Sequence, residues 1–431
     1  MAVATRDQQD DIAPDPPGIF DFDVQLVLGV AALVAFGLLM VYSTTFDWSY
    51  LAFGSPIRIF LRQVRSLLVG LVALVIAWRI DYRILRNRTV ATGIMLLTVL
   101  ALVVLLLIPG AEPINGETPT RSLLNGSLQP GEAAKLAIIL YFSAWLASRR
   151  DKLHKIGYGL IPFTILIGAV GGLIVLQPDL STAAVIVLTA GTMFFIAGAN
   201  LLQVGLIASG AVGVGWLLAT QFGYARERLV DHISAMSDLT EASWHVQQAV
   251  IAFTAPGSRT ANGGCTPNWS GVGLGQSSQK FGFLPAAHTD SIFAIIGEEL
   301  GLFGCLFVLL LYGLLVWRAL VISREAPDFF GAILAVGIGA WIAFEAGLNV
   351  AVITALVPFT GITLPFISFG GSSLVVVLTA VGLLMNISRR RPVRLIKISE
   401  RELASADVDF SSAPGRARRK HAVRRIRRGE R

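Results

Sequence analysis

Residues 271–304 read Gly-Val-Gly-Leu-Gly-Gln-Ser-Ser-Gln-Lys-Phe-Gly-Phe-Leu-Pro-Ala-Ala-His-Thr-Asp-Ser-Ile-Phe-Ala-Ile-Ile-Gly-Glu-Glu-Leu-Gly-Leu-Phe-Gly. A glycine-rich polar loop carrying Lys280 runs to His288 and Asp290, and a long apolar run follows immediately. We therefore expect Asp290 where a loop meets a membrane helix, a position from which a carboxylate could act as a general base on an amphiphilic substrate. The alternative interpretation is that Thr289 or Asp290 is an ordinary N-cap of that helix.

The composition is that of an integral membrane protein. Of the 431 residues, 54% are hydrophobic and 15% are charged, which leaves too little polar surface to cover a soluble globule of this length. A spanning helix needs about 20 apolar residues. The apolar runs predict an all-α polytopic bundle of ten spans near 24–43, 59–78, 90–109, 132–148, 157–176, 180–198, 202–221, 291–317, 329–355 and 371–388.

Positive charges follow the even-numbered predicted spans. Clusters of Lys and Arg lie in the stretches 79–88, 149–155, 318–324 and 389–391. The positive-inside rule then predicts two cytoplasmic termini, with an N-terminal tail 1–23, a membrane domain 24–388 and a basic, disordered tail 389–431. From residue 389 on there are fifteen Lys and Arg against five acids, which favours anchoring to anionic lipid over nucleic-acid binding.

Two of the loops on the opposite side carry charge close to a helix start. Residues 110–131 include Gln129 and lead into Glu132 and Lys135, at the beginning of an otherwise apolar helix. Charges in such a place either pair with each other or bind a ligand. Asp179, which follows Gln177-Pro178, is predicted to cap the next helix.

Two further segments are irregular. Residues 222–290 are too many for a simple connector, and their early part, from Trp244, is predicted to form a short helix along the membrane. Residues 357–373 contain two prolines and three glycines at membrane depth. Such a non-helical segment is tolerated only where it lines a cavity or packs on protein. The two cysteines, Cys265 and Cys305, indicate neither a disulfide framework nor a zinc site.

Together these loops resemble the SEDS family (shape, elongation, division and sporulation), polytopic peptidoglycan glycosyltransferases represented by FtsW, RodA and SpoVE. The resemblance covers roughly residues 20–390, and the division type, FtsW, fits slightly better than RodA. Four motifs carry it, in this order: Asn115-Gly116 and Arg121 with Gln129-Pro130, Glu132 and Lys135; Gln177-Pro178-Asp179; residues 273–304; and residues 365–373.

The chain also departs from the family pattern. Ser122 stands where tryptophan usually follows the arginine, and Gly131 where serine usually precedes the glutamate. Ala286 occupies the place of a glutamate that commonly follows Leu-Pro. The aromatic–glutamine pair ahead of the glycine loop corresponds here to Trp244-His245, and the segment 254–270 is longer than usual.

The resemblance implies a reaction and a set of residues. Family members polymerise lipid II at the outer face of the cytoplasmic membrane, with undecaprenyl diphosphate as the leaving group. The base corresponds to Asp290, and the cations that would bind the diphosphate to Arg121, Lys135 and Lys280. Substrate contacts are further expected at Gln129, Glu132, Asp179, His288 and Ser372, and a divalent cation, Mg or Mn, on Glu132 and Asp179 stays open. Family members work with a class B penicillin-binding protein transpeptidase and with other divisome or elongasome proteins.

Two other functions compete with synthesis. A flippase or transporter for the same lipid-linked precursor would also have ten spans, broken helices and charges within the membrane. A non-catalytic scaffold would only recruit division proteins. The polar residues cluster at the outer ends of the predicted spans rather than around the midplane, which favours an enzyme that works from one side.

Overall fold

The computed structural model describes residues 22–107, 129–177, 179–221, 223–237, 243–254 and 268–389. Their helices are α1 (Val24–Phe53), α2 (Arg58–Arg79), η1 (Tyr82–Arg86), α3 (Arg88–Leu107), α4 (Pro130–Ser148), η2 (Arg150–Lys152), α5 (Leu160–Val175), α6 (Leu180–Ile196), α7 (Leu201–Gln221), α8 (Gly223–Ser237), α9 (Trp244–Thr254), α10 (Ile292–Glu325), α11 (Phe329–Ile353) and α12 (Gly371–Arg389). The Asn115-Gly116 motif, Arg121, Pro178, Cys265 and the basic tail after residue 389 lie outside the described residues.

The predicted all-α membrane architecture is confirmed. α1 to α7 and α10 to α12 lie at the ten predicted ranges. Seven of these helices are long and apolar enough to cross a membrane, and α5 and α6 are shorter apolar helices. The chain is therefore a multi-pass membrane protein.

The end of α1 was predicted too early. The helix continues past residue 43 to Phe53 through a polar stretch that the search for apolar runs excluded. Thr44 Oγ1 donates to the Met40 carbonyl at 2.9 Å, and Thr45 Oγ1 donates to the Val41 carbonyl at 2.7 Å. Because these hydroxyls find acceptors on their own helix, the helix can continue past them.

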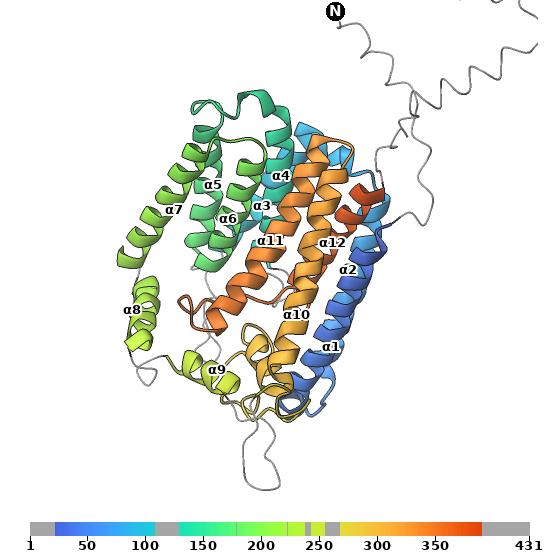
Figure 1. The fold of residues 1–431 in the computed structure, drawn as a ribbon, viewed down its shortest axis with the longest axis vertical. Helices are drawn as coiled ribbons and strands as arrows, with labels where there is room; N and C mark the ends of the chain where they lie inside the picture. Colours follow the sequence, from blue (N-terminus) through green and yellow to red (C-terminus); the bar gives the residue numbers. More distant parts are fainter. Residues whose placement is uncertain are drawn as a thin grey trace, which may run out of the picture. The chain divides into compact units, whose positions relative to one another are not determined.

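The membrane helices pack around α10 and α11 (Figure 1). α1, α2 and α12 lie on one side of this pair, and α5, α6 and α7 on the other. α2 and α12 approach closely at Gly382, where an added Cβ would lie 2.4 Å from the Leu74 carbonyl oxygen. Small residues at such crossings let membrane helices pack closely. Asn386 Nδ2 also donates to the Ala77 and Trp78 carbonyls near the end of α2.

The long segment between α7 and α10 contains two helices. α9 confirms the short helix predicted from Trp244, whereas α8 was not predicted. α8 contains Arg226, Glu227, Arg228 and Asp231, so it has no apolar run that would reveal it. Both helices lie toward the same end of the bundle as the start of α10 (Figure 1).

α10 is broken one third of the way along, and the loop before it completes the break. Gly301 has φ 64° and ψ −157° inside the helix. The Leu302 and Phe303 amides donate to the Asn268 and Trp269 carbonyls, while the carbonyls of Glu298 and Glu299 accept from Val272 and Gly273. Segment 268–273 thus supplies the partners that the missing helical turn would have provided, which satisfies backbone that is buried from water.

This exchange predicts a position-specific effect of alanine. In Gly271→Ala the new Cβ would lie 2.3 Å from the Glu299 carbonyl oxygen and would also occupy a left-handed backbone conformation, φ 72°. We expect a clear loss of thermal stability in detergent. The matched control is Gly275→Ala, which has a similar φ of 78° but open space around the Cβ, and which should lose only about 1–2 kcal/mol. Equal melting temperatures for the two variants would contradict the docking of this loop on α10.

Candidate functional site

Asp290 lies in a tight turn just before α10. The turn is closed by Ala286, whose φ is 51° and whose carbonyl accepts from the Thr289 amide at 3.0 Å and the Ser291 amide at 3.2 Å. The N-cap of α10 is Ser291, without a side-chain capping bond. Neither Thr289 nor Asp290 is therefore the N-cap that the alternative interpretation required.

The half-buried Asp290 lies against the irregular segment between α11 and α12. An added Cβ on Gly361 would lie 2.7 Å from Asp290 Oδ2, so a larger residue here would require the carboxylate to move. Asn349 Nδ2, from α11, donates to both the Asp290 carbonyl at 2.8 Å and the Ile362 carbonyl at 2.6 Å. One amide thus fixes Asp290 and its neighbouring segment to each other.

Residues 354–370 are non-helical, as predicted, and residues 362 and 364–368 are buried. This segment forms one wall of a cavity that opens to solvent, with about 370 Å³ of space not filled by atoms when the open solvent at its mouth is included. The cavity is lined by Gln129, Glu132, Lys135, Asp179, Ser181, Thr182, Val185, Glu345, Gly361, Ile362 and Thr363. Asp290 itself does not line this cavity, but its carboxylate lies next to Gly361, which belongs to the wall.

Lys135 is held between two carboxylates. Its Nζ lies 2.6 Å from Glu345 Oε1 and 3.0 Å from Glu132 Oε1, and 5.4 Å from the centroid of the Trp341 ring. Trp341 Nε1 donates to the other oxygen of Glu345. Lys135, Glu132 and Glu345 are 3%, 6% and 1% exposed. Burial of charge is tolerated because each group has a partner of opposite sign.

Asp179 and Gln129 sit at helix starts on the cavity wall. Asp179 caps α6, as predicted: it accepts from the Thr182 amide at 3.1 Å and from the Ser181 hydroxyl at 2.9 Å. Gln129 is the N-cap residue of α4, and its backbone amide donates to Ser372 Oγ at 3.0 Å. The structure therefore brings together Gln129, Glu132, Lys135, Asp179 and Ser372.

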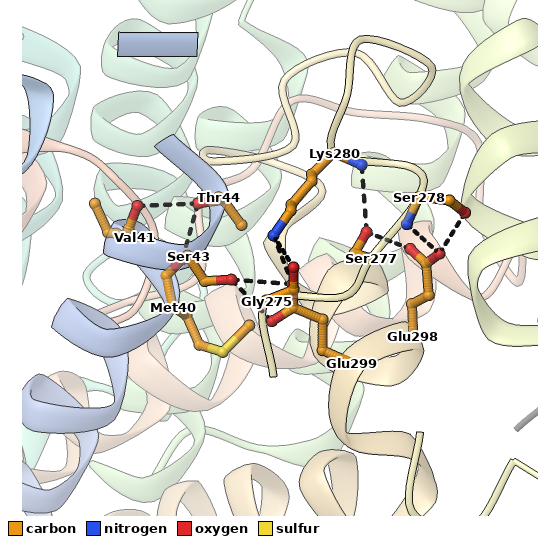
Figure 2. Close-up of polar contacts among 10 residues, drawn as sticks. All are labelled: Met40, Val41, Ser43, Thr44, Gly275, Ser277, Ser278, Lys280, Glu298 and Glu299. Atoms are coloured by element: carbon orange, nitrogen blue, oxygen red, sulfur yellow. Dashed lines mark hydrogen bonds and ion pairs between the residues drawn. The ribbon is translucent and has the colours of Figure 1, made fainter. Parts of the chain in front are cut away.

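Lys280 belongs to a different cluster, shown in Figure 2. Its Nζ donates to the Gly275 carbonyl at 2.7 Å and lies 3.3 Å from Glu299 Oε1. Ser43 Oγ, from α1, donates to both oxygens of Glu299 at 2.9 Å. Next to it, Glu298 accepts from the Ser278 amide at 2.9 Å and from the Ser277 hydroxyl. These contacts hold the glycine-rich loop onto α10 and α1, and Lys280 does not line the 370 Å³ cavity.

His288 is packed between aromatic rings. Its ring stacks on Trp48 with centroids 5.4 Å apart, and its centroid is 5.6 Å from that of Phe369. The His288 carbonyl accepts from the Phe369 amide at 2.8 Å. Burial lowers the pKa of His288 to about 4, so the ring is neutral at pH 7 and connects the Asp290 turn to the start of α12.

Several residues at the site were not predicted from the sequence. Glu345 and Asn349 lie one helical turn apart on α11, and a glutamate within an apolar span was a signal that could have identified them. Ser43 is an ordinary hydroxyl at the end of the predicted span 24–43 and carried no such signal, and Trp48 lies beyond the end predicted for α1. Among the described residues, no group of three His, Cys, Asp or Glu is placed to hold a metal ion.

Residues 24–392 match a family model described as cell cycle protein, FTSW_RODA_SPOVE. The chain is 35% identical over 381 residues to the probable peptidoglycan glycosyltransferase FtsW of Trichlorobacter lovleyi, covering 88% of this chain and 96% of that one. It is 36% identical over 372 residues to stage V sporulation protein E of Bacillus subtilis, covering 85% and 97%.

Solved structures share the fold. The rod shape determining protein RodA of Thermus thermophilus aligns with a TM-score of 0.62 at 26% identity, covering 87% of this chain and 99% of that one. A chain from a peptidoglycan synthase complex, in a structure on the coordination of polymerisation and crosslinking, aligns with a TM-score of 0.66 at 27% identity, covering 86% and 98%.

The Lys135 cluster predicts a partner-dependent loss of stability. Lys135→Met leaves Glu132 and Glu345 facing each other without a cation, and breaking a buried ion pair in this way costs about 3–5 kcal/mol. We expect a lower melting temperature in detergent. Lys135→Met combined with Glu345→Gln should recover part of the loss, since one of the two uncompensated charges is gone. A double variant less stable than Lys135→Met would contradict this pairing.

The half-buried His288 predicts a pH dependence. Its pKa is about 4 in the folded chain against about 6.5 when unfolded. Folding therefore favours the neutral ring, and this stabilisation is full above pH 6.5 and is lost as the pH falls from 6.5 to 4. We expect the melting temperature to fall over this window, and less steeply in His288→Gln. Substitution of the exposed His154 by Asn is the control, and an unchanged slope in His288→Gln would refute the assignment.

Proposed function

Because the chain belongs to the FtsW, RodA and SpoVE (SEDS) family of cell cycle proteins, we propose that it polymerises lipid II into glycan strands during cell division. Its curated relatives are named peptidoglycan glycosyltransferases, and glycosyl transfer in cell wall synthesis is its activity. The observation that carries the mechanism is the position of Asp290: its carboxylate lies next to Gly361, a residue in the wall of a polar cavity. The FtsW relatives favour the division type.

The reaction is a displacement at the anomeric carbon of the donor glycan. The oxygen of the acceptor's 4-hydroxyl bonds to that carbon, and Asp290 accepts the proton that the hydroxyl loses. The bond from the carbon to the diphosphate oxygen breaks, undecaprenyl diphosphate leaves as an anion, and the configuration inverts. Such a reaction needs a placed base and positive charge near the leaving group. Asn349 and Gly361 supply the placement of the base.

The positive charge comes from more than one source in this proposal. Lys135 is the cation on the described cavity wall, with Arg121 from the preceding loop, whereas Lys280 pairs with Glu299 away from that wall and holds the glycine-rich loop. The wall also carries Glu132, Asp179 and Glu345, an excess of negative charge. That excess fits a hydrated magnesium or manganese ion on Glu132 and Asp179, since magnesium is commonly bound by one or two carboxylates together with phosphate. Such an ion would offset charge on the diphosphate.

We place the cavity at the outer face of the membrane. α4 begins at the cavity and ends just before Arg149 and Arg150, and α10 begins beside Asp290 and carries Arg324 in its last turn. The basic clusters therefore lie at the opposite ends of the helices that form the site. With the positive-inside rule, this supports cytoplasmic basic clusters, cytoplasmic termini and an outward-facing cavity.

A transpeptidase is the proposed partner. One similar chain comes from a peptidoglycan synthase complex that couples polymerisation with crosslinking. We infer that this chain likewise works with a class B penicillin-binding protein and with other division proteins. The transporter and scaffold alternatives differ from synthesis in one respect that can be measured, because only a polymerase makes glycan from purified protein and lipid II.

The decisive variant is Asp290→Asn, which keeps size and removes the base. We expect polymer formation in proteoliposomes, with the matched penicillin-binding protein present, to fall by about 10²–10⁴-fold. Asp47→Asn is the matched control, since Asp47 is also half-buried and lies near the same end of the bundle on α1. Full activity of Asp290→Asn would exclude this mechanism, and lipid II translocation without polymer in the wild type would favour a transporter.

A further inference from the structure

His245 of α9 touches both chain segments that surround Asp290. Its Nε2 lies 2.5 Å from Ser291 Oγ, and Ser291 directly follows Asp290. Its ring centroid lies 3.9 Å from that of Phe359, with the ring planes 35° apart. Phe359 stands two residues before Gly361, the residue against which the Asp290 carboxylate lies. The His245 side chain thus bridges the two chain segments on either side of the proposed base.

The hydroxyl of Ser291 is committed to this contact. Ser291 is the N-cap of α10, a position where a serine side chain usually accepts from an amide in the first turn. Here it makes no capping bond, the residue is completely buried, and the hydroxyl meets His245 instead. The Ser291 hydroxyl therefore contacts α9 instead of capping its own helix.

The far side of Phe359 is held by α8. Arg228 Nη1 donates to the Phe359 carbonyl at 2.9 Å, and its guanidinium carbon lies 5.6 Å from the ring centroid. Phe359 is thus contacted by His245 and by Arg228, both from the segment between α7 and α10. Burial, and after it the charge of Arg228, lowers the pKa of His245 to about 4, so at neutral pH the ring is uncharged and bridges by packing and hydrogen bonding.

We propose that His245 is a positioning residue for Asp290. It fixes the distance between Ser291, which follows Asp290, and Phe359, which precedes Gly361, so that the carboxylate keeps its place next to Gly361. His245 does not itself take the substrate's proton. This inference rests on the proposed function, and it assigns to the segment between α7 and α10 a direct effect on the rate of the chemical step.

The test is a double-mutant cycle in the lipid II polymerisation assay. His245→Phe keeps the ring against Phe359 and removes the hydrogen bond, and Ser291→Ala removes the other partner. Each should lower kcat by up to about 100-fold, the effect of a base displaced by about 1 Å, while KM for lipid II stays within about twofold. The double variant should be no slower than the slower single one, because both remove the same contact.

Two further variants control for folding and chemistry. His245→Gln keeps a hydrogen-bonding side chain and should recover most of the kcat lost in His245→Phe. Trp244→Phe loses the neighbouring bond from Trp244 Nε1 to the Phe283 carbonyl and should retain wild-type kcat. Monodispersity in detergent verifies that every variant is folded.

Three outcomes would overturn the inference: losses that multiply in the double variant, a change confined to KM, or wild-type kcat in His245→Phe. These are distinct from failure of the proposed function, in which the wild type makes no polymer or Asp290→Asn remains active.

Discussion

Irregular backbone at membrane depth must find all its hydrogen-bond partners within the protein, because lipid offers none. Two irregular segments meet at Asp290, the turn before α10 and residues 354–370, and helices around them supply the partners. Gln63 of α2 donates to the Ser368 carbonyl at 3.2 Å, Tyr312 of α10 donates to the Pro365 carbonyl, and Ser368 Oγ donates to the Thr289 carbonyl at 2.6 Å. The bonds that satisfy this backbone also fix the carboxylate.

The same requirement explains why charge is distributed as it is. Glu298 and Glu299 are 1% and 0% exposed, yet both are satisfied by the glycine-rich loop and by Ser43. Lys135 is satisfied by Glu132 and Glu345. The first cluster holds a loop in place, whereas the second lines a cavity and can exchange partners with a ligand. Burial alone does not distinguish the two, but the neighbouring cavity does.

The sequence predicted what depends on local pattern. Helices at the ten predicted ranges, the short helix at Trp244, the cap at Asp179 and the non-helical backbone of residues 357–370 all follow from apolar runs, prolines and glycines. It could not predict contacts between distant segments: the exchange of backbone bonds at Gly301, the placement of Lys280 on Glu299, or the contact of Gly361 with Asp290. These depend on which helices pack together, and a single sequence does not contain that information in its periodicity.

How far polar side chains extend into the bundle distinguishes an enzyme that works from one side from a transporter that carries its substrate across. Beyond Lys135, toward the middle of the bundle, the next cavity is smaller and is lined by Ile138, Ile139, Val185, Ile186, Thr189 and Trp341 besides Lys135 itself. A carrier for a charged diphosphate needs polar groups near the midplane, but these walls are mainly aliphatic. Among the described residues, the charged lining ends at Lys135 and Glu345, which suits an enzyme that receives both substrates from one side.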